Sequence, residues 1–193
     1  MSCPNLAFTT SYLGQYSMTP GKPHWKALLH VLHYLQGTCT LVLILGCVSD
    51  TDLDVLTGYT DANWICNIDD YHSISGYLFK LGDMTISWNG MKQSTVASSL
   101  MEAKYIMTSH GVKQAVWLHQ LPVYAGIVGE LPPSTTLYVN NTGAISLTKE
   151  PCFHSHTHHI PVHFHFVCKL VYRWPYAYYT VHTYIRHACW WFY

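Results

Sequence analysis

The apolar positions of this chain recur at helical spacing near the start, then in alternating runs, and later at helical spacing again. The pattern in the N-terminal part of the chain predicts a short helix over Asn5–Tyr16 and an amphipathic helix that ends at Gly37. The apolar stripe of this second helix consists of Trp25, Leu28, Leu29, Leu32 and Leu35. A long helix is predicted from Val96 to about Leu121.

Between these helices lie segments with strand-like patterns, at Thr40–Cys47, Leu56–Asp61, Ser75–Leu81 and Thr85–Trp88. Gly82-Asp83 joins the last two as a hairpin turn, so an antiparallel meander is the simplest arrangement. Another alternating run, Thr136–Val139, follows the long helix and precedes a short helix over Asn141–Lys149. Strands followed by helix, strand and helix predict a mixed α/β sheet domain in two or three layers.

Composition changes this picture in two ways. The formal net charge is zero and charged residues make up 10% of the 193 residues, so the basic footprint of an autonomous nucleic-acid binder is missing. The longest strongly apolar run, Leu41–Val48, is far shorter than the roughly 20 residues that span a bilayer. We therefore expect no membrane partner.

The termini and cysteines bear on location. The N-terminus lacks the charged start and apolar centre of a secretory signal, and the 7 cysteines contain no CxxC pair. This pattern argues against a disulfide framework or a zinc ribbon. We expect an intracellular location, in the cytoplasm or a virus-like particle or the nucleus, and no evident small-molecule ligand.

Two carboxylates are candidates for chemistry. Asp61 ends a predicted strand and Glu102 lies within the long helix, and a strand-end Asp and a helical Glu can converge on Mg²⁺. A second strand end carries the amides Asn140 and Asn141, at the kind of position where α/β proteins place ligands. The amides lack the charge that a metal ion or a proton transfer would require.

Several motifs together resemble one known family. GYTDANW around Asp61, MEAKY around Glu102, LYVNNTGAISL around Asn140 and the histidine-rich FHSHTHHIPVHFHF are similar to the ribonuclease H domain of copia-type retrotransposon Pol polyproteins. The resemblance runs from about Asn5 to Val167. The N-terminal part of this matching region is similar to the segment that connects the reverse transcriptase to the ribonuclease H domain in the same family.

The resemblance implies three regions. Residues 1–48 would be the connection segment, residues 49–168 an incomplete ribonuclease H-like domain, and residues 169–193 a tail unlike the family. The tail has two interpretations, a shifted reading frame or a lineage-specific extension. The implied fold is a five-stranded mixed sheet flanked by helices.

The implied activity is cleavage of the RNA strand of RNA–DNA hybrids during reverse transcription, with Mg²⁺ or Mn²⁺ as cofactor. The implied partners are the hybrid and the reverse transcriptase portion of the same polyprotein. Two metal ions in one site require several carboxylates to balance their charge, and the family uses four.

By resemblance Asp61 and Glu102 match the first two metal-binding acids. Asn140 stands where the family has a catalytic Asp, and no acid follows Glu150 to supply the fourth. Lys104 stands at another position where the family has Glu. We therefore expect weakened metal binding and a nuclease activity that is lost or impaired.

Four further residues are expected to bind substrate, namely Lys92, Gln93, Ser99 and Asn141. For Lys92 and Gln93 the alternative is plain solvent exposure, and Ser99 could instead cap the long helix. The histidines from His154 to His165 invite a zinc site but are interpreted as family scaffolding. Two other functions stay open, a noncatalytic nucleic-acid-binding or interaction module and a nonfunctional pseudogene product.

Overall fold

The computed structural model describes residues 3–45, 56–67, 69–126, 135–149, 167 and 179–183. In chain order the elements are η1 (Pro4–Leu6), α1 (Ala7–Gly14), α2 (Lys22–Gly37), β1 (Leu56–Asn63), β2 (Ile74–Leu81), β3 (Met84–Lys92), α3 (Leu100–Tyr124), β4 (Thr135–Val139), α4 (Thr142–Lys149) and β5 (Tyr179–Thr183). The predicted order of strands, helix, strand and helix is confirmed from β1 to α4.

The strands form one mixed sheet in the order β3-β2-β1-β4-β5. The pairs β1–β2 and β2–β3 are antiparallel, which confirms the predicted meander, whereas β1–β4 and β4–β5 are parallel. Strand β5 comes from residues 169–193, for which the sequence predicted no element. The predicted strand Thr40–Cys47 is wrong over residues 40–45, which contain no strand, and its end lies outside the described residues.

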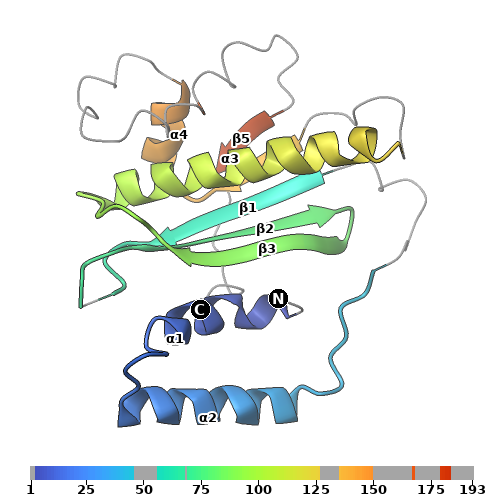
Figure 1. Cartoon of the computed structure of the whole chain (residues 1–193). Coiled ribbons are helices and arrows are strands. Elements are labelled where there is room, and N and C mark those ends of the chain that lie inside the picture. The colour runs from blue at the N-terminus through green and yellow to red at the C-terminus, as the bar shows by residue number, and fades with distance from the viewer. Residues whose placement is uncertain are drawn as a thin grey trace.

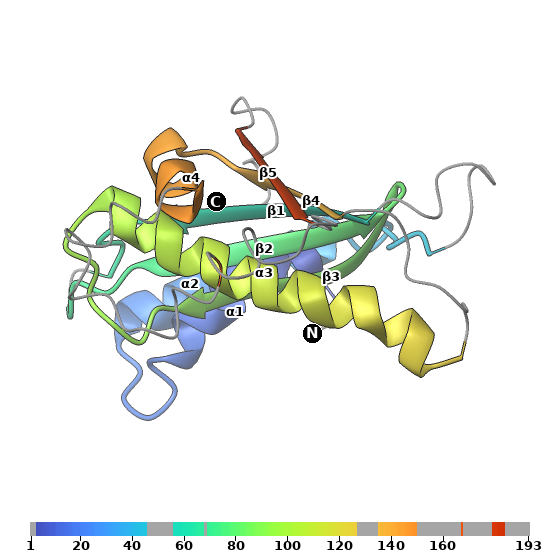
Figure 2. The ribbon, with the colours of Figure 1, turned by 90° about the horizontal axis from the view of Figure 1, so that it is seen from above.

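Helices cover both faces of the sheet, so the described part of the chain has three layers (Figure 1). Helices α3 and α4 pack against each other on one face, and α1 contacts β3 on the other. The view from above shows α3 in front of the sheet with α1 and α2 behind it (Figure 2). This arrangement confirms the predicted mixed α/β domain.

The main core lies between α3 and the sheet. Its largest buried side chains are Tyr105, Ile106, Met107 and Val112 of α3 with Phe79, Leu137 and Val139 of the strands. Gly111 lets the helix approach closely, because a Cβ there would lie 2.4 Å from the Thr60 Cγ2 atom. Helix α3 is therefore held directly over β1, the strand that carries Asp61.

On the opposite face the contact between α1 and β3 depends on a second glycine. A Cβ at Gly90 would lie 3.1 Å from the backbone N and Cα of Phe8 and 3.2 Å from the Ala7 carbonyl carbon. Helix α1 thus packs backbone to backbone on the sheet. Part of the predicted connection segment covers the same sheet as the predicted ribonuclease H-like region, and the boundaries at residues 48 and 168 stay predictions.

Helix α2 forms as its amphipathic pattern predicts, but its apolar stripe is not buried. Trp25 is 61% and Leu32 51% exposed, and no residue of the helix is buried. Among the described residues no helix is both long enough and apolar enough to cross a membrane.

Candidate functional site

The parallel pairing of β1 with β4 brings Asp61 and Asn140 together. Thr60 of β1 pairs with Val139, the last residue of β4, at the end of the ladder. The next residues in the chain are Asp61, still within β1, and Asn140, directly after β4. The carboxyl ends of neighbouring parallel strands lie at one edge of a sheet. The meeting of these two positions, which the sequence suggested, follows from this register.

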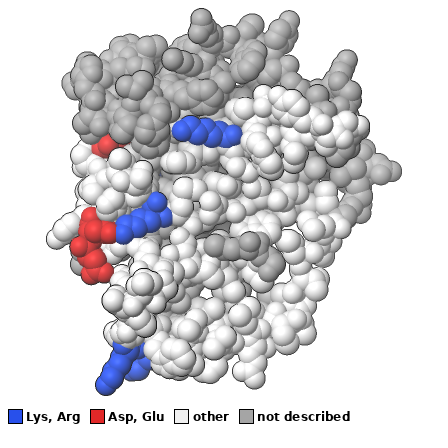
Figure 3. Space-filling model, viewed as in Figure 1, with Lys and Arg blue, Asp and Glu red and all other residues white. Residues whose placement is uncertain are grey.

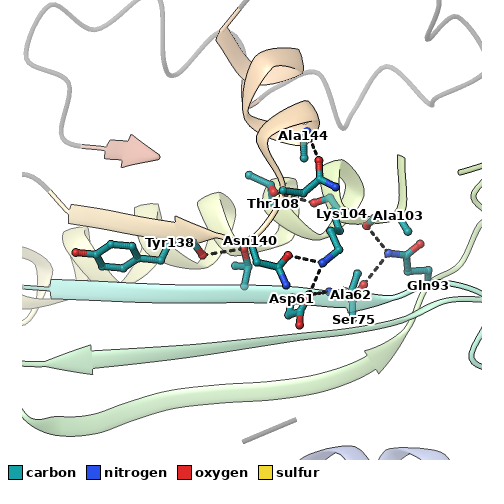
Figure 4. Close-up of polar contacts among 12 residues, drawn as sticks. Asp61, Ala62, Ser75, Gln93, Ala103, Lys104, Thr108, Tyr138, Asn140 and Ala144 are labelled. Carbon is teal, nitrogen blue, oxygen red and sulfur yellow. Dashed lines mark hydrogen bonds and ion pairs between the residues drawn. The ribbon is translucent and has the colours of Figure 1, made fainter. Parts of the chain in front are cut away.

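The third member of the site is Lys104, which reaches down from α3. Its Nζ donates a hydrogen bond to Asp61 Oδ1 at 2.9 Å and another to Asn140 Oδ1. In the close-up its ammonium points between the two strand ends (Figure 4). Asp61 Oδ1 also accepts from the Ala62 amide at 2.8 Å. One ammonium therefore links two strands and a helix.

This ion pair is buried. The side chains of Lys104 and Asp61 are 10% and 6% exposed. A buried ion pair contributes little net stability compared with apolar residues, but removal of one partner leaves an uncompensated charge and costs about 3–5 kcal/mol. The one negative charge and the one positive charge balance each other, and the amide of Asn140 adds none.

Glu102 lies on the same helix but faces another way. Residues two apart on an α-helix differ in direction by about 200°, so Glu102 and Lys104 do not share a face. The Glu102 carboxylate accepts hydrogen bonds from the backbone N and the Oγ of Ser98, at 2.7 and 2.5 Å. These two bonds hold the start of α3, and the role of Glu102 as a metal ligand stays a prediction.

Two of the predicted substrate-binding residues cap helices. Ser99 Oγ accepts a hydrogen bond from the Glu102 backbone N at 3.1 Å, as an N-cap of α3, which is the alternative considered for it. Asn141 Oδ1 accepts from the Ala144 backbone N at 2.8 Å and caps α4 in the same way. Both side chains thus satisfy orphan backbone N–H groups at helix starts.

The other two predicted substrate-binding residues also have partners within the chain. Gln93 is buried, and its Nε2 donates to Ser75 Oγ at 2.6 Å and to the Ala103 carbonyl at 2.8 Å. It connects the end of β3 to α3, so a contact with substrate would require it to leave these bonds. Lys92 pairs with Asp70 and donates to Gln15 Oε1 at 3.2 Å.

The Lys92–Asp70 pair belongs to a group of contacts between the α1 region and the loop after β1. The hydrogen bond from the Lys92 ammonium holds the pKa of Asp70 below its usual value. Beside it, Tyr16 Oη donates to Asp69 Oδ2 at 2.8 Å. These contacts fasten the N-terminal helices to the edge of the sheet.

The metal ion that the resemblance implies does not fit the donors at this site. In proteins Mg²⁺ is usually bound through one or two carboxylates together with water and phosphate oxygens, whereas the Asp61 carboxylate is here paired with an ammonium, beside a neutral amide. At an effective dielectric constant of about 20, a divalent ion about 4 Å from an ammonium is repelled by about 8 kcal/mol. Across the described ranges no group of three or more His, Cys, Asp and Glu residues is arranged to hold a metal ion, and the histidines from His154 to His165 lie outside these ranges.

In the sequence Lys104 stood out only as a departure from the family pattern. The resemblance placed the second metal ligand at Glu102, because MEAKY matches the family's helix motif at that position. One signal was available, since Tyr105 and Ile106 belong to the buried stripe and position 104 lies beside them. The actual contact with Asp61 spans 43 residues and no local pattern reports it.

Comparison with curated proteins places the chain among transposon polyproteins. It is 36% identical over 164 residues to a retrovirus-related Pol polyprotein from transposon RE2 of Arabidopsis thaliana, which covers 85% of this chain and 11% of that polyprotein. It is 33% identical over 168 residues to the polyprotein from transposon TNT 1-94 of Nicotiana tabacum, with 87% and 12% covered. The chain thus spans only about a ninth of the length of these relatives.

A relative of another kind is the secreted RxLR effector protein 161 of Plasmopara viticola. It is 41% identical over 115 residues, which cover 60% of this chain and 79% of that protein. No protein-family profile matches the chain.

Among solved structures, the chain overlaps with RNase H1 from the halophilic archaeon Halobacterium salinarum NRC-1 at 10% identity and a TM-score of 0.42, covering 69% of this chain and 87% of that one. It overlaps with LC11-RNase H1 in complex with an RNA/DNA hybrid at 13% identity and a TM-score of 0.40, with the same coverage.

Proposed function

Because this chain belongs to the family of copia-type retrotransposon Pol polyproteins, of which it is one segment, we propose that it is a ribonuclease H-like domain that has lost hybrid cleavage. The family activity is metal-dependent cutting of the RNA strand of an RNA–DNA hybrid. The loss of cleavage is proposed from three residues of this chain, Asp61, Lys104 and Asn140.

One observation carries the proposal, the ion pair between Asp61 and Lys104 beside Asn140. A two-metal reaction needs anionic oxygens that bridge the ions and balance their charge. Here the only carboxylate of the three residues is already neutralised, and the amide offers a neutral oxygen. The proposal therefore rests on the missing negative charge.

Binding of the hybrid without cleavage would depend on cationic side chains that contact phosphates. Lysine and arginine are sparse on the described part of the face drawn in Figure 3. Lys92, a candidate for phosphate contact, is held by Asp70. We therefore propose at most weak, salt-sensitive binding to the hybrid, with an intracellular location and the reverse transcriptase portion of the polyprotein as partner.

A cleavage assay tests the proposal. The purified chain is incubated with end-labelled RNA–DNA hybrid in Mg²⁺, in Mn²⁺ and in a chelator, with Asp61→Asn as the matched control. We expect equal, background product in all samples. Metal-dependent product that disappears in Asp61→Asn would refute the loss of activity, whereas product that persists in the variant would indicate a contaminating nuclease.

The similarity to the effector protein favours a second candidate function. This segment covers 79% of that relative, so most of that protein corresponds to this segment alone. We propose as the alternative a noncatalytic interaction module. Binding of a protein partner with no affinity for the hybrid would favour it over the first proposal.

A further inference from the structure

We propose that the Lys104 ammonium is the resident cation of this site and excludes divalent metal ions from it. The inference rests on the proposed function in one respect, that the site descends from one built around metal ions. It goes further because it assigns the cation position to a side chain of this protein. The residue at position 104 then determines whether a divalent metal ion can bind beside Asp61.

The Lys104 ammonium lies between oxygens of two different strands' ends. Lys104 Nζ donates to the Oδ1 atoms of both Asp61 and Asn140, from strands that are neighbours in the sheet. Oxygens from two strand ends that converge on one point would serve a cation, and the cation present is the ammonium (Figure 4). Lysine supplies three donors and one charge in a compact group.

The charges of Asp61 and Lys104 balance each other. The pair is buried, with side-chain exposures of 10% and 6%, so solvent screens it little. With one carboxylate, one ammonium and one amide, the three residues need no further ion. A divalent ion bound to Asp61 would have to displace the ammonium or lie beside it, and both are unfavourable.

Helix α3 carries position 104 to the two strands, because the Lys104 Nζ meets Asp61 and Asn140 from this helix. Glu102, two positions earlier, leaves the helix in a direction about 200° from that of Lys104, and its carboxylate accepts hydrogen bonds from Ser98. A carboxylate at position 104 would therefore lie beside Asp61 and Asn140, at the place that the ammonium now occupies.

The experiment compares two double variants of equal charge. Lys104→Glu/Asn140→Asp introduces two acids beside Asp61, whereas the control Lys26→Glu/Asn140→Asp puts one of them on the exposed surface of α2. The melting temperature of each variant and of the unaltered chain is measured at increasing concentrations of Mn²⁺. The references are a sample without added metal and a sample with a chelator.

We expect the melting temperature of the Lys104→Glu/Asn140→Asp variant to rise by roughly 5–10 °C at about a hundredfold excess of Mn²⁺ over its dissociation constant. The unaltered chain and the control should shift much less. Failure of the folded Lys104→Glu/Asn140→Asp variant to respond would overturn the inference.

Direct titration of the unaltered chain with Mn²⁺ decides the case where that variant does not fold. No saturable binding that depends on Asp61 is expected, and binding that Asp61→Asn abolishes would overturn the inference. Such binding without hybrid cleavage would leave the proposed function standing. Cleavage by the unaltered chain would refute the proposed function by a separate readout.

Discussion

Lys104 Nζ lies 2.9 Å from Asp61 Oδ1, across the interface between α3 and β1, and both side chains are buried. The two residues are 43 positions apart. Their contact joins the helix to the sheet at the point where the family resemblance implies metal ions. It gives a direct test of how the site is held together.

The first prediction is a coupling between the members of this pair. Lys104→Met leaves the Asp61 carboxylate buried without its cation and should lower the free energy of unfolding by about 3–5 kcal/mol. Asp61→Asn should also destabilise the chain. In the double variant Asp61→Asn/Lys104→Met the loss should fall short of the sum of the two single losses by about 0.5–3 kcal/mol, as measured by urea unfolding. Strict additivity would mean that the two side chains do not interact in solution.

The second prediction concerns Glu102. Glu102→Ala removes the acceptor for the Ser98 backbone N and Oγ, so unfolding should become easier by about 1–3 kcal/mol. The loss should be the same with and without Mn²⁺, because the carboxylate acts here at the helix start. A loss that grows when Mn²⁺ is added would instead support the sequence-based assignment of Glu102 as a metal ligand.

The third prediction concerns the packing of α1 on β3. Gly90→Val should cost about 1–3 kcal/mol, because the added atoms would meet the backbone of Phe8, which cannot move aside as a side chain can. Hydrogen exchange of the amides in α1 should accelerate. Gly14→Ala is the control, since nothing lies within 4 Å of a Cβ there. Unchanged exchange in Gly90→Val would show that α1 does not rest on the sheet in solution.

The fourth prediction is a dependence of stability on pH from Asp70. Its pKa is lowered in the folded chain, first by the hydrogen bond from Lys92. A carboxyl group with a lowered pKa stabilises the folded state above its unfolded-state pKa, and this contribution disappears as the pH falls through the folded-state pKa.

Urea unfolding at a series of pH values checks this. Asp70→Asn should be less stable than the unaltered chain near neutral pH, and the difference should vanish in acid. Asp83→Asn is the control, because Asp83 is 84% exposed and lies 3.7 Å from the Lys80 ammonium. If both variants show the same difference at every pH, the Lys92–Asp70 contact does not shift the titration.

The order of elements from β1 to α4 could be predicted because each has a local signal. Alternation marks Thr136–Val139 as a strand, the turn at Gly82-Asp83 joins β2 to β3, and apolar residues of α3 from Leu100 to Leu118 recur at helical spacing. The prediction of a strand from Thr40 was wrong over residues 40–45, which contain no strand. A short apolar run has no period of its own, and only pairing with a neighbour would make it a strand.

For the candidate site, the sequence supplied Asp61 and Asn140 at strand ends but not their partner. The roles of Ser99 and Asn141 as caps depend on hydrogen bonds within one turn, so they lie within reach of local reasoning. Gln93 was expected near substrate but is buried, since its environment depends on Ser75 and the α3 carbonyl of Ala103. Burial of a polar side chain depends on distant parts of the chain.

The sequence by itself determined the family, the helices and strands from β1 to α4, and the absence of charge at Asn140, because these depend on residue identity and local spacing. Only the tertiary structure decided that the Lys104 ammonium, 43 residues from Asp61 in the chain, meets Asp61 and Asn140. That contact depends on the close approach of α3 to β1, which Gly111 permits, and on the register that brings β4 beside β1. Contacts between distant segments depend on the packing of helix and sheet, which no local pattern of residues reports.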